Sequence, residues 1–139
     1  MQLQPYLFLN GRCEEALEFY KKALGAQIVM MMRMKESPEP HPPGMLPPGS
    51  ENKIMHAQVA VGDAHFMASD GRASGDLHFK GFALSLAFPD EAGARKAFAA
   101  LSKQGHVDMP IGKTFWSPCF GMVTDQFGVQ WMTTVIHEM

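Results

Sequence analysis

The feature that most constrains the fold is an order of expected elements that occurs twice along the chain. In the first half, the residue pattern predicts a helix over 13–24 and strands over 3–9, 27–34, 54–61 and 64–69. In the second half, it predicts a helix that begins at about residue 90 and strands over 81–88, 107–111, 120–124 and 129–136. Each half is therefore expected to form a βαβββ module whose sheet needs a covering layer.

Capping residues mark the ends of both expected helices. The first helix has apolar residues at helical spacing, namely Cys13, Ala16, Leu17, Tyr20 and Leu24. Gly25 is expected to end this helix in the left-handed conformation. Asp90 is the expected N-cap of the second helix, and Gly105 is expected to end it. The two halves thus share an order of elements without an obvious identity of sequence.

The length of 139 residues suits a single domain made of two modules, 1–70 and 81–139, with a polar linker over 70–80. Six of the ten prolines lie in residues 35–53, so this stretch is expected to be a long loop in the first module. Such a loop is either a mobile binding element or an insertion without a role, and the sequence leaves both readings open.

Composition excludes several classes of partner. The formal net charge is −2 and no basic stripe is visible, so no nucleic-acid partner is expected. The apolar runs are shorter than the roughly 20 residues that a membrane span needs, and no secretory signal is recognisable. Cys13 and Cys119 are far apart and are expected to be reduced thiols. These features predict a cytoplasmic protein without a membrane association.

The expected architecture leaves a concave surface for a ligand. Two four-stranded sheets placed together, with helices on their outer faces, would give an α+β fold with a cavity between the sheets. The chain contains 12 methionines. Flexible thioether side chains suit an adaptable apolar pocket, so an unidentified small molecule is the expected partner.

Motifs at both ends of the chain resemble the PhnB-like branch of the vicinal-oxygen-chelate superfamily, which includes glyoxalase I, extradiol dioxygenases and bleomycin-resistance proteins. The first helix carries Phe19-Tyr20 followed by Leu24-Gly25-Ala26. The remaining matches are Pro5-Tyr6-Leu7-Phe8, the segment 54–57 with His56, Phe115-Trp116, Phe120-Gly121, Val123-Thr124-Asp125, Phe127-Gly128-Val129 and Trp131.

The resemblance implies an α+β fold in which paired βαβββ modules form a cupped mixed sheet with helices on the outer face. It also implies a homodimer, but it does not fix a reaction. PhnB-like proteins often carry the label 3-demethylubiquinone-9 3-methyltransferase. A methyltransferase that holds its adenosyl cofactor in the usual way needs a glycine-rich turn after a strand of a parallel sheet. No GxGxxG run follows an expected strand here.

In the metal-dependent members of the family, each module supplies a first-strand His or Gln and a last-strand Glu as ligands. In this chain, the first-strand positions correspond to Gln4 and to Phe82 or Ala83. The last-strand positions correspond to Met67 or Ala68 and to Met132. Thioether and hydrocarbon side chains are poor ligands for hard metals. We therefore expect no cofactor, with a divalent metal as an open alternative for which Gln4 and His56 are the candidates.

Two functional hypotheses follow, one a binding protein and the other an enzyme, and the sequence leaves both open. The first is a protein that binds a small molecule in the cup without the usual metal, through His56, Gln58, Trp116, Phe120 and Met132. The second is a metal-dependent lyase, isomerase or dioxygenase with an unorthodox ligand set, for which His56, His65 and Asp70 are conceivable ligands. The alternative role of His56 is a hydrogen-bonded histidine in a polar patch.

Overall fold

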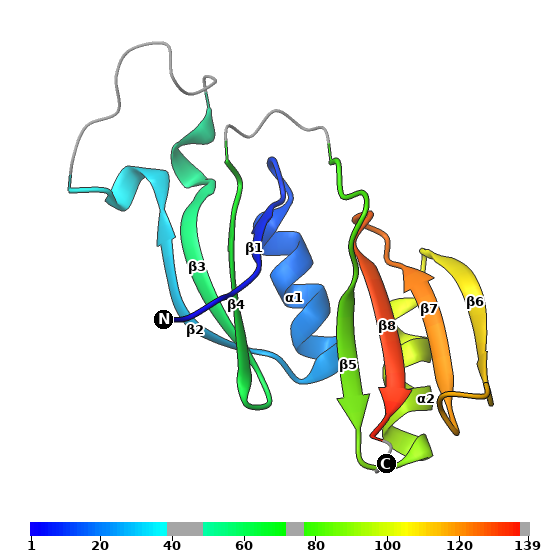
Figure 1. Cartoon of the computed structure of the whole chain (residues 1–139). Coiled ribbons are helices and arrows are strands. Elements are labelled where there is room, and N and C mark those ends of the chain that lie inside the picture. Colours follow the sequence, from blue (N-terminus) through cyan, green and yellow to red (C-terminus); the bar gives the residue numbers. More distant parts are fainter. Residues whose placement is uncertain (39–48, 72–76, 137–139) are drawn as a thin grey trace. The chain divides into compact units, whose positions relative to one another are not determined.

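The computed structural model describes residues 1–38, 49–71 and 77–136, and the chain forms two compact units, Met1–Leu77 and His78–Met139. Each unit contains one long helix and one four-stranded mixed sheet (Figure 1). Both units follow the order strand, helix, strand, strand, strand. The predicted α+β class and the repeated βαβββ order are confirmed.

The first unit contains β1 (Tyr6–Phe8), α1 (Cys13–Leu24), β2 (Gln27–Arg33), β3 (Ile54–Val61) and β4 (Ala64–Ser69). Its strand order is β1-β4-β3-β2, with β1 parallel to β4 and the other pairs antiparallel. Two short 3-10 turns, η1 (Met34–Glu36) and η2 (Ser50–Asn52), follow β2 and precede β3.

The second unit repeats this arrangement with β5 (Leu84–Phe88), α2 (Glu91–Leu101), β6 (His106–Gly112), β7 (Phe120–Thr124) and β8 (Gln130–Val135). Its strand order is β5-β8-β7-β6, with β5 parallel to β8. Both sheets also carry a register shift on the edge strand, at Ile28/Met30 in β2 and at Val107/Met109 in β6. The two units therefore match strand by strand.

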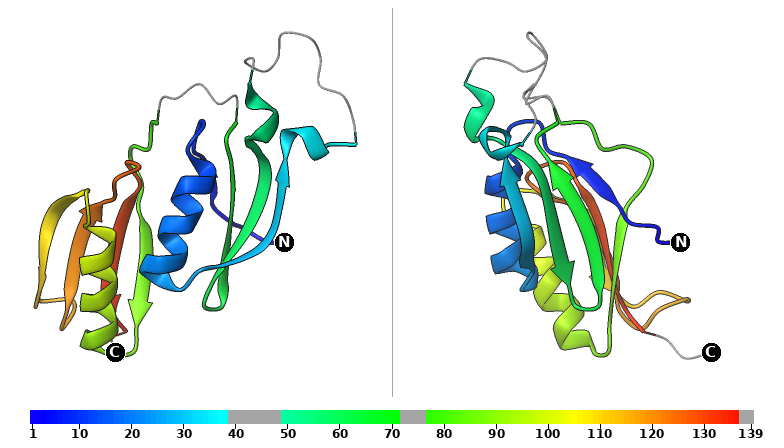
Figure 2. Two further views of the ribbon diagram at one scale, coloured as in Figure 1. Left: turned by 180° about the vertical axis from the view of Figure 1, so that it is seen from behind. Right: turned by 90° about the vertical axis from the view of Figure 1, so that its left-hand side faces the viewer.

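Each sheet packs one face against the helix of its own unit (Figure 2). In the first sheet, the side chains of this face are buried, namely Leu7, Ala57, Val59, Phe66 and Ala68. In the second sheet, Trp131 and Val123 are buried, and Phe98 of α2 lies against Gly121. Because side chains alternate along a strand, the other residues point to the opposite side, which we call the distal face of each sheet.

The expected helix ends are confirmed except at one residue. Gly25 has φ 67° and caps α1, and Asp90 caps α2 by accepting a hydrogen bond of 2.8 Å from the Gly93 N–H. The prediction that Gly105 ends the second helix is wrong, because α2 ends at Leu101. A Cβ at Gly105 would lie 2.4 Å from the Thr124 carbonyl oxygen, so this glycine permits a close approach of two backbone segments.

Some strand bounds and the expected loop differ from the prediction. The strands expected over 3–9, 81–88 and 129–136 are shorter, at Tyr6–Phe8, Leu84–Phe88 and Gln130–Val135. Residues 35–53 are not loop throughout, because η1 and η2 lie at their ends and the Met34 N–H donates to the Lys53 carbonyl at 2.9 Å. The two readings of this stretch, a mobile binding element or an insertion without a role, concern mainly residues 39–48, which lie outside the described residues.

Asp70 joins three separated segments of the first unit. Its Oδ1 accepts hydrogen bonds of 2.8 Å from the N–H groups of Gly11 and Cys13, and its Oδ2 accepts one of 2.7 Å from Ile54. The side chain is 1% exposed. The chain thus caps the start of α1 with a carboxylate that is remote in sequence.

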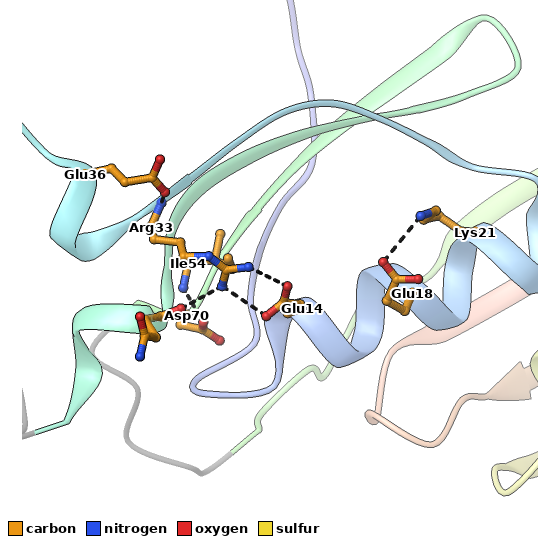
Figure 3. A network of polar contacts seen from close by, with 8 residues as sticks. Glu14, Glu18, Lys21, Arg33, Glu36, Ile54 and Asp70 are labelled. Atoms are coloured by element: carbon orange, nitrogen blue, oxygen red, sulfur yellow. Dashed lines mark hydrogen bonds and ion pairs between the residues drawn. The ribbon is translucent and has the colours of Figure 1, made fainter.

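A second polar network lies beside Asp70 at the start of α1 (Figure 3). Arg33 donates two hydrogen bonds to the Glu14 carboxylate, at 3.0 and 2.6 Å, and one of 2.8 Å to the Asn52 carbonyl. The bonds from Arg33 lower the pKa of Glu14. Burial, followed by the charges of Asp70 and Glu14, raises the pKa of the Cys13 thiol well above its usual range. Together these bonds hold η2 and β2 against α1.

Asp125 has a corresponding structural role in the second unit. Its Oδ1 accepts hydrogen bonds from the N–H groups of Phe127 and Val129, at 2.9 and 3.1 Å. Its Oδ2 accepts a bond of 2.8 Å from the indole N–H of Trp131. This carboxylate therefore shapes the turn between β7 and β8 and fixes Trp131 on the α2 side, which sends Met132 to the distal face.

Candidate functional site

The distal face of the first sheet carries aromatic and thioether side chains around a histidine. The register pairs Tyr6 with Met67, Met67 with Gln58, and Gln58 with Met30, so these residues form one row across the four strands. Beside this row lie Phe8, which follows Tyr6 on the same face of β1, and His56, which pairs with Met32. The face therefore combines ring surfaces and soft apolar side chains with two polar groups.

Tyr6 is the centre of this aromatic group. Its ring stacks on Phe8 with a centroid distance of 4.9 Å and lies 5.7 Å from the His56 ring. The Tyr6 hydroxyl oxygen and His56 Nδ1 are 2.9 Å apart, which is hydrogen-bonding distance. Phe8 is 54% exposed and Tyr6 36% exposed. Such rings can pack against a planar molecule, and the His56–Tyr6 pair can add a polar contact.

The distal face of the second sheet contains an equivalent row. Ser85 pairs with Met132, Met132 with Met122, and Met122 with Met109. Because the two units match strand by strand, Met67 and Met132 occupy equivalent positions. Trp116, which is 46% exposed, packs its ring edge against Phe120 at a centroid distance of 5.3 Å. Phe120 is largely buried beneath it.

The five predicted ligand-binding residues fall into two groups. His56 and Gln58 lie on the distal face of the first sheet, and Trp116, Phe120 and Met132 lie in the second unit. Sequence reasoning missed Tyr6 and Phe8 as site residues. The available signal was their alternation with the buried Leu7 in a short strand. The alternation by itself did not show which face of the sheet carries the site. The parallel pairing of β1 with β4 places Tyr6 beside Met67 and so identifies that face.

Residues at the family's metal positions do not form a donor set for a hard divalent metal. Phe82 and Ala83, the positions assigned in the second unit, precede β5 and carry no donor atom in their side chains. On the last strands, Met67 pairs with Tyr6 and Met132 pairs with Ser85. Ala68, the alternative to Met67, is fully buried on the α1 side. Gln4 precedes β1. Thioether sulfur is a poor ligand for metals that prefer oxygen, so these residues do not fit the metal centre that the family implies.

The conceivable site of His56, His65 and Asp70 is also not assembled. Asp70 directs its carboxylate oxygens at three backbone N–H groups, and His65 pairs with Ala60 near the β3–β4 hairpin. In the part of the chain that the structure describes, no group of three or more His, Cys, Asp or Glu side chains could hold a metal ion. The expectation that Asp70 could act as a ligand is therefore replaced by its role as a structural anchor.

A hollow of about 150 Å³ lies at the start of α1, lined in part by Glu14, Arg33, Lys53 and Asp70. Its charged groups are already engaged with one another and with the backbone. Arg33 binds Glu14, Lys53 donates to the Gly11 carbonyl at 2.8 Å, and Asp70 accepts from the backbone. The hollow thus belongs to the network that holds the fold, and the distal faces are the better candidates for a ligand site.

Comparison with known proteins supports one family across the chain. A family model described as the Glyoxalase/Bleomycin resistance protein/Dioxygenase superfamily matches residues 2–133. The protein YjdN of Escherichia coli (strain K12) is 34% identical over 145 residues, which cover 99% of this chain and 97% of that protein. Within residues 1–38, 49–71 and 77–136, neither long helix is of the length and apolarity that crossing a membrane requires.

Two solved structures are similar over almost the whole chain. The protein PA1353 from Pseudomonas aeruginosa is 40% identical, with a TM-score of 0.84 and 99% of both chains covered. A PhnB protein from Bacillus cereus is 26% identical, with a TM-score of 0.80, covering 98% of this chain and 100% of that chain. The name of the latter proposes a 3-demethylubiquinone-9 3-methyltransferase.

Proposed function

Because this chain belongs to the Glyoxalase/Bleomycin resistance protein/Dioxygenase superfamily, we propose that it is a PhnB-like protein that binds a small organic molecule with a planar ring. The ring is placed on the distal face of the first sheet, against Tyr6 and Phe8, with His56 and Gln58 as polar contacts. Trp116, Phe120 and Met132 are proposed as ligand contacts within the second unit by itself. The binding does not use the family's divalent metal.

The observation that carries this proposal is the exposed aromatic group on β1. Tyr6 and Phe8 are stacked on each other and yet both remain exposed. Exposed rings of this kind lose contact with water when a flat ligand packs on them, and each aromatic pair adds about 0.5–1.5 kcal/mol beyond the area buried. His56 lies within reach of the same surface, so it can orient a ligand that carries a hydrogen-bonding group.

Two other activities are less well supported by the residues. The methyltransferase named for the Bacillus cereus relative needs a cofactor site, and such sites are usually built on a parallel, helix-flanked sheet. Both sheets described here are mixed and four-stranded. A metal-dependent lyase, isomerase or dioxygenase would need oxygen or nitrogen donors where Met67 and Met132 stand.

The proposed binding protein acts as a cytoplasmic homodimer. Both cysteines are buried and unbridged, which suits a reducing compartment. The edge strands β2 and β6 carry exposed apolar residues, Val29 and Val107, and exposed apolar edges favour association with another chain. Sedimentation at micromolar concentration should therefore give the mass of a dimer, and a monomer would contradict the assembly.

The ligand proposal can be tested with 1-anilinonaphthalene-8-sulfonate, a fluorescent molecule with a planar aromatic ring system. We expect saturable binding to the wild type. In the double variant Tyr6→Leu/Phe8→Leu the dissociation constant should be at least about tenfold larger, which corresponds to a loss of about 1.4 kcal/mol in binding free energy. Phe82→Leu is the matched control because Phe82 is 47% exposed and is not among the proposed ligand contacts. Equal affinity of the β1 double variant and the wild type would contradict the assigned surface.

A separate measurement tests the absence of the family's metal. Zn(II), Ni(II), Mn(II) or Fe(II) in slight excess should leave the melting temperature of the wild type unchanged. A ligand at a hundred times its dissociation constant would add about 2.7 kcal/mol of stability, which a thermal melt detects easily. A saturable rise in melting temperature that His56→Ala abolishes would favour the metal-dependent enzyme instead.

A further inference from the structure

Three methionines lie side by side on the distal face of the second sheet. Met132 on β8 pairs directly with Met122 on β7, and Met122 pairs with Met109 on β6. All three side chains are half-buried. In the equivalent row of the first sheet, Gln58 stands between Met67 and Met30. The uninterrupted row of thioethers is therefore specific to the second unit.

Directly opposed residues of antiparallel strands have Cα atoms about 4.5–5.5 Å apart. A methionine side chain has three rotatable bonds, and its sulfur can reach toward a neighbour on the same face. The sulfur atoms of Met109 and Met132 can therefore approach that of Met122 from both sides. Three thioethers held on a rigid sheet in this way form a soft donor set.

A histidine on the same face is oriented as a metal-ligating histidine would be. His106 pairs with Thr124, which lies two residues from Met122 on the same face of β7. The Nδ1 atom of His106 is 3.0 Å from Asp108 Oδ1, and the Thr124 hydroxyl donates to Asp108 Oδ2 at 2.6 Å. A carboxylate that binds one ring nitrogen leaves the other nitrogen for a metal. Most metal-ligating histidines make such a hydrogen bond through the nitrogen that does not bind the metal.

The register shift on β6 explains why these residues share a face. Asp108 is the extra residue of β6 between the pair of Val107 with Val123 and the pair of Met109 with Met122. A bulge places two residues of one strand opposite a single residue of its partner. His106, two residues before Asp108, can therefore lie on the same side as Met109, although the spacing of three residues in a regular strand would separate them.

From this arrangement we propose that the second sheet binds a soft monovalent metal ion, Cu(I) or Ag(I). The ligands are the sulfur atoms of Met109, Met122 and Met132 together with Nε2 of His106. Thioethers select soft ions and bind hard divalent ions poorly, so this site is chemically distinct from the metal centre that the family implies. It shares Met132 with the ligand contacts proposed in the second unit, but it shares no residue with the surface of Tyr6, Phe8, His56 and Gln58 that the planar probe tests.

The test uses Ag(I), which is stable in air, added as the nitrate to protein labelled with methyl-¹³C methionine in a chloride-free buffer. We expect the methyl resonances of Met109, Met122 and Met132 to shift together and to saturate at one equivalent, while that of Met67 stays in place. Cys13 and Cys119 are fully buried and compete only if the fold opens. Shifts confined to other methionines, or no shift at one equivalent, would overturn the site.

Variants separate the metal ligands from a general effect on the fold. Met122→Leu keeps the apolar volume but removes the central sulfur, so Ag(I) affinity should fall at least about tenfold. Met67→Leu, at the equivalent position of the first sheet, should bind Ag(I) like the wild type. Asp108→Asn should weaken binding by about 10–100-fold, because it changes only the group that orients His106. Wild-type affinity in both Met122→Leu and Asp108→Asn would overturn the proposal, whatever the result with the planar probe.

Discussion

Replacing Asp70 with alanine is expected to lower the free energy of unfolding by about 3–5 kcal/mol. The substitution leaves the N–H groups of Gly11, Cys13 and Ile54 without their acceptor, in a place where the carboxylate was 1% exposed. Each buried N–H without a partner costs about 1–3 kcal/mol, and two of these groups lie at the start of α1, where no intrahelical partner exists. Urea denaturation followed by far-ultraviolet circular dichroism measures the change.

Asp63→Ala is the control for the loss of a carboxylate. Asp63 lies in the exposed turn between β3 and β4, so its removal should change the stability by less than about 0.5 kcal/mol. The free energy of unfolding of Asp70→Asn should lie between those of Asp70→Ala and Asp63→Ala, because the amide keeps one oxygen but presents an N–H group to a backbone donor. If Asp70→Ala were no less stable than Asp63→Ala, the three bonds would not be the anchor of the first unit.

The parts of the fold that the sequence predicted are those controlled by neighbours along the chain. The bounds of α1 follow from apolar spacing and from Gly25, which provides the left-handed cap. Asp90 caps α2 through a group only three residues away. Both sheets were expected because alternating apolar residues and tight turns specify strands locally. Such signals lie within a few residues, so a single sequence contains them.

The parts that were missed depend on residues far apart in sequence. Asp70 accepts a hydrogen bond from Cys13, which is 57 positions away in the sequence. No residue near the start of α1 indicated that Asp70 would cap this helix. Gly105 is required by the approach of Thr124, which only the folded chain reveals. The distal face of the first sheet was assigned through His56 and Gln58, but Tyr6 was not recognised until β1 paired with β4.

The motif that identifies the family and the residues that would define its activity lie on opposite sides of the last sheet. Asp125 stabilises the turn between β7 and β8, and its hydrogen bond to the indole N–H holds Trp131 in the core that faces α2. Met132, the next residue, lies on the distal face beside Ser85 and Met122. A chain can therefore keep the motif and the fold while its distal residues change. This explains why the family can be recognised from the motif while the ligand and the reaction cannot.

The carboxylate of Asp125 is expected to stabilise the second unit by about 3–4 kcal/mol, as measured by urea denaturation of Asp125→Ala. The variant removes the carboxylate that accepts from the N–H groups of Phe127 and Val129 and from the indole N–H of Trp131, which is 2% exposed. Trp131→Phe removes that indole donor, so the double variant should be about 1–2 kcal/mol more stable than the sum of the two single changes predicts. Asp63→Ala combined with Trp131→Phe is the matched pair without contact, and its effects should add within about 0.5 kcal/mol. Strict additivity of Asp125→Ala and Trp131→Phe would mean that the bond between them does not hold the turn, and that the motif positions Met132 by packing alone.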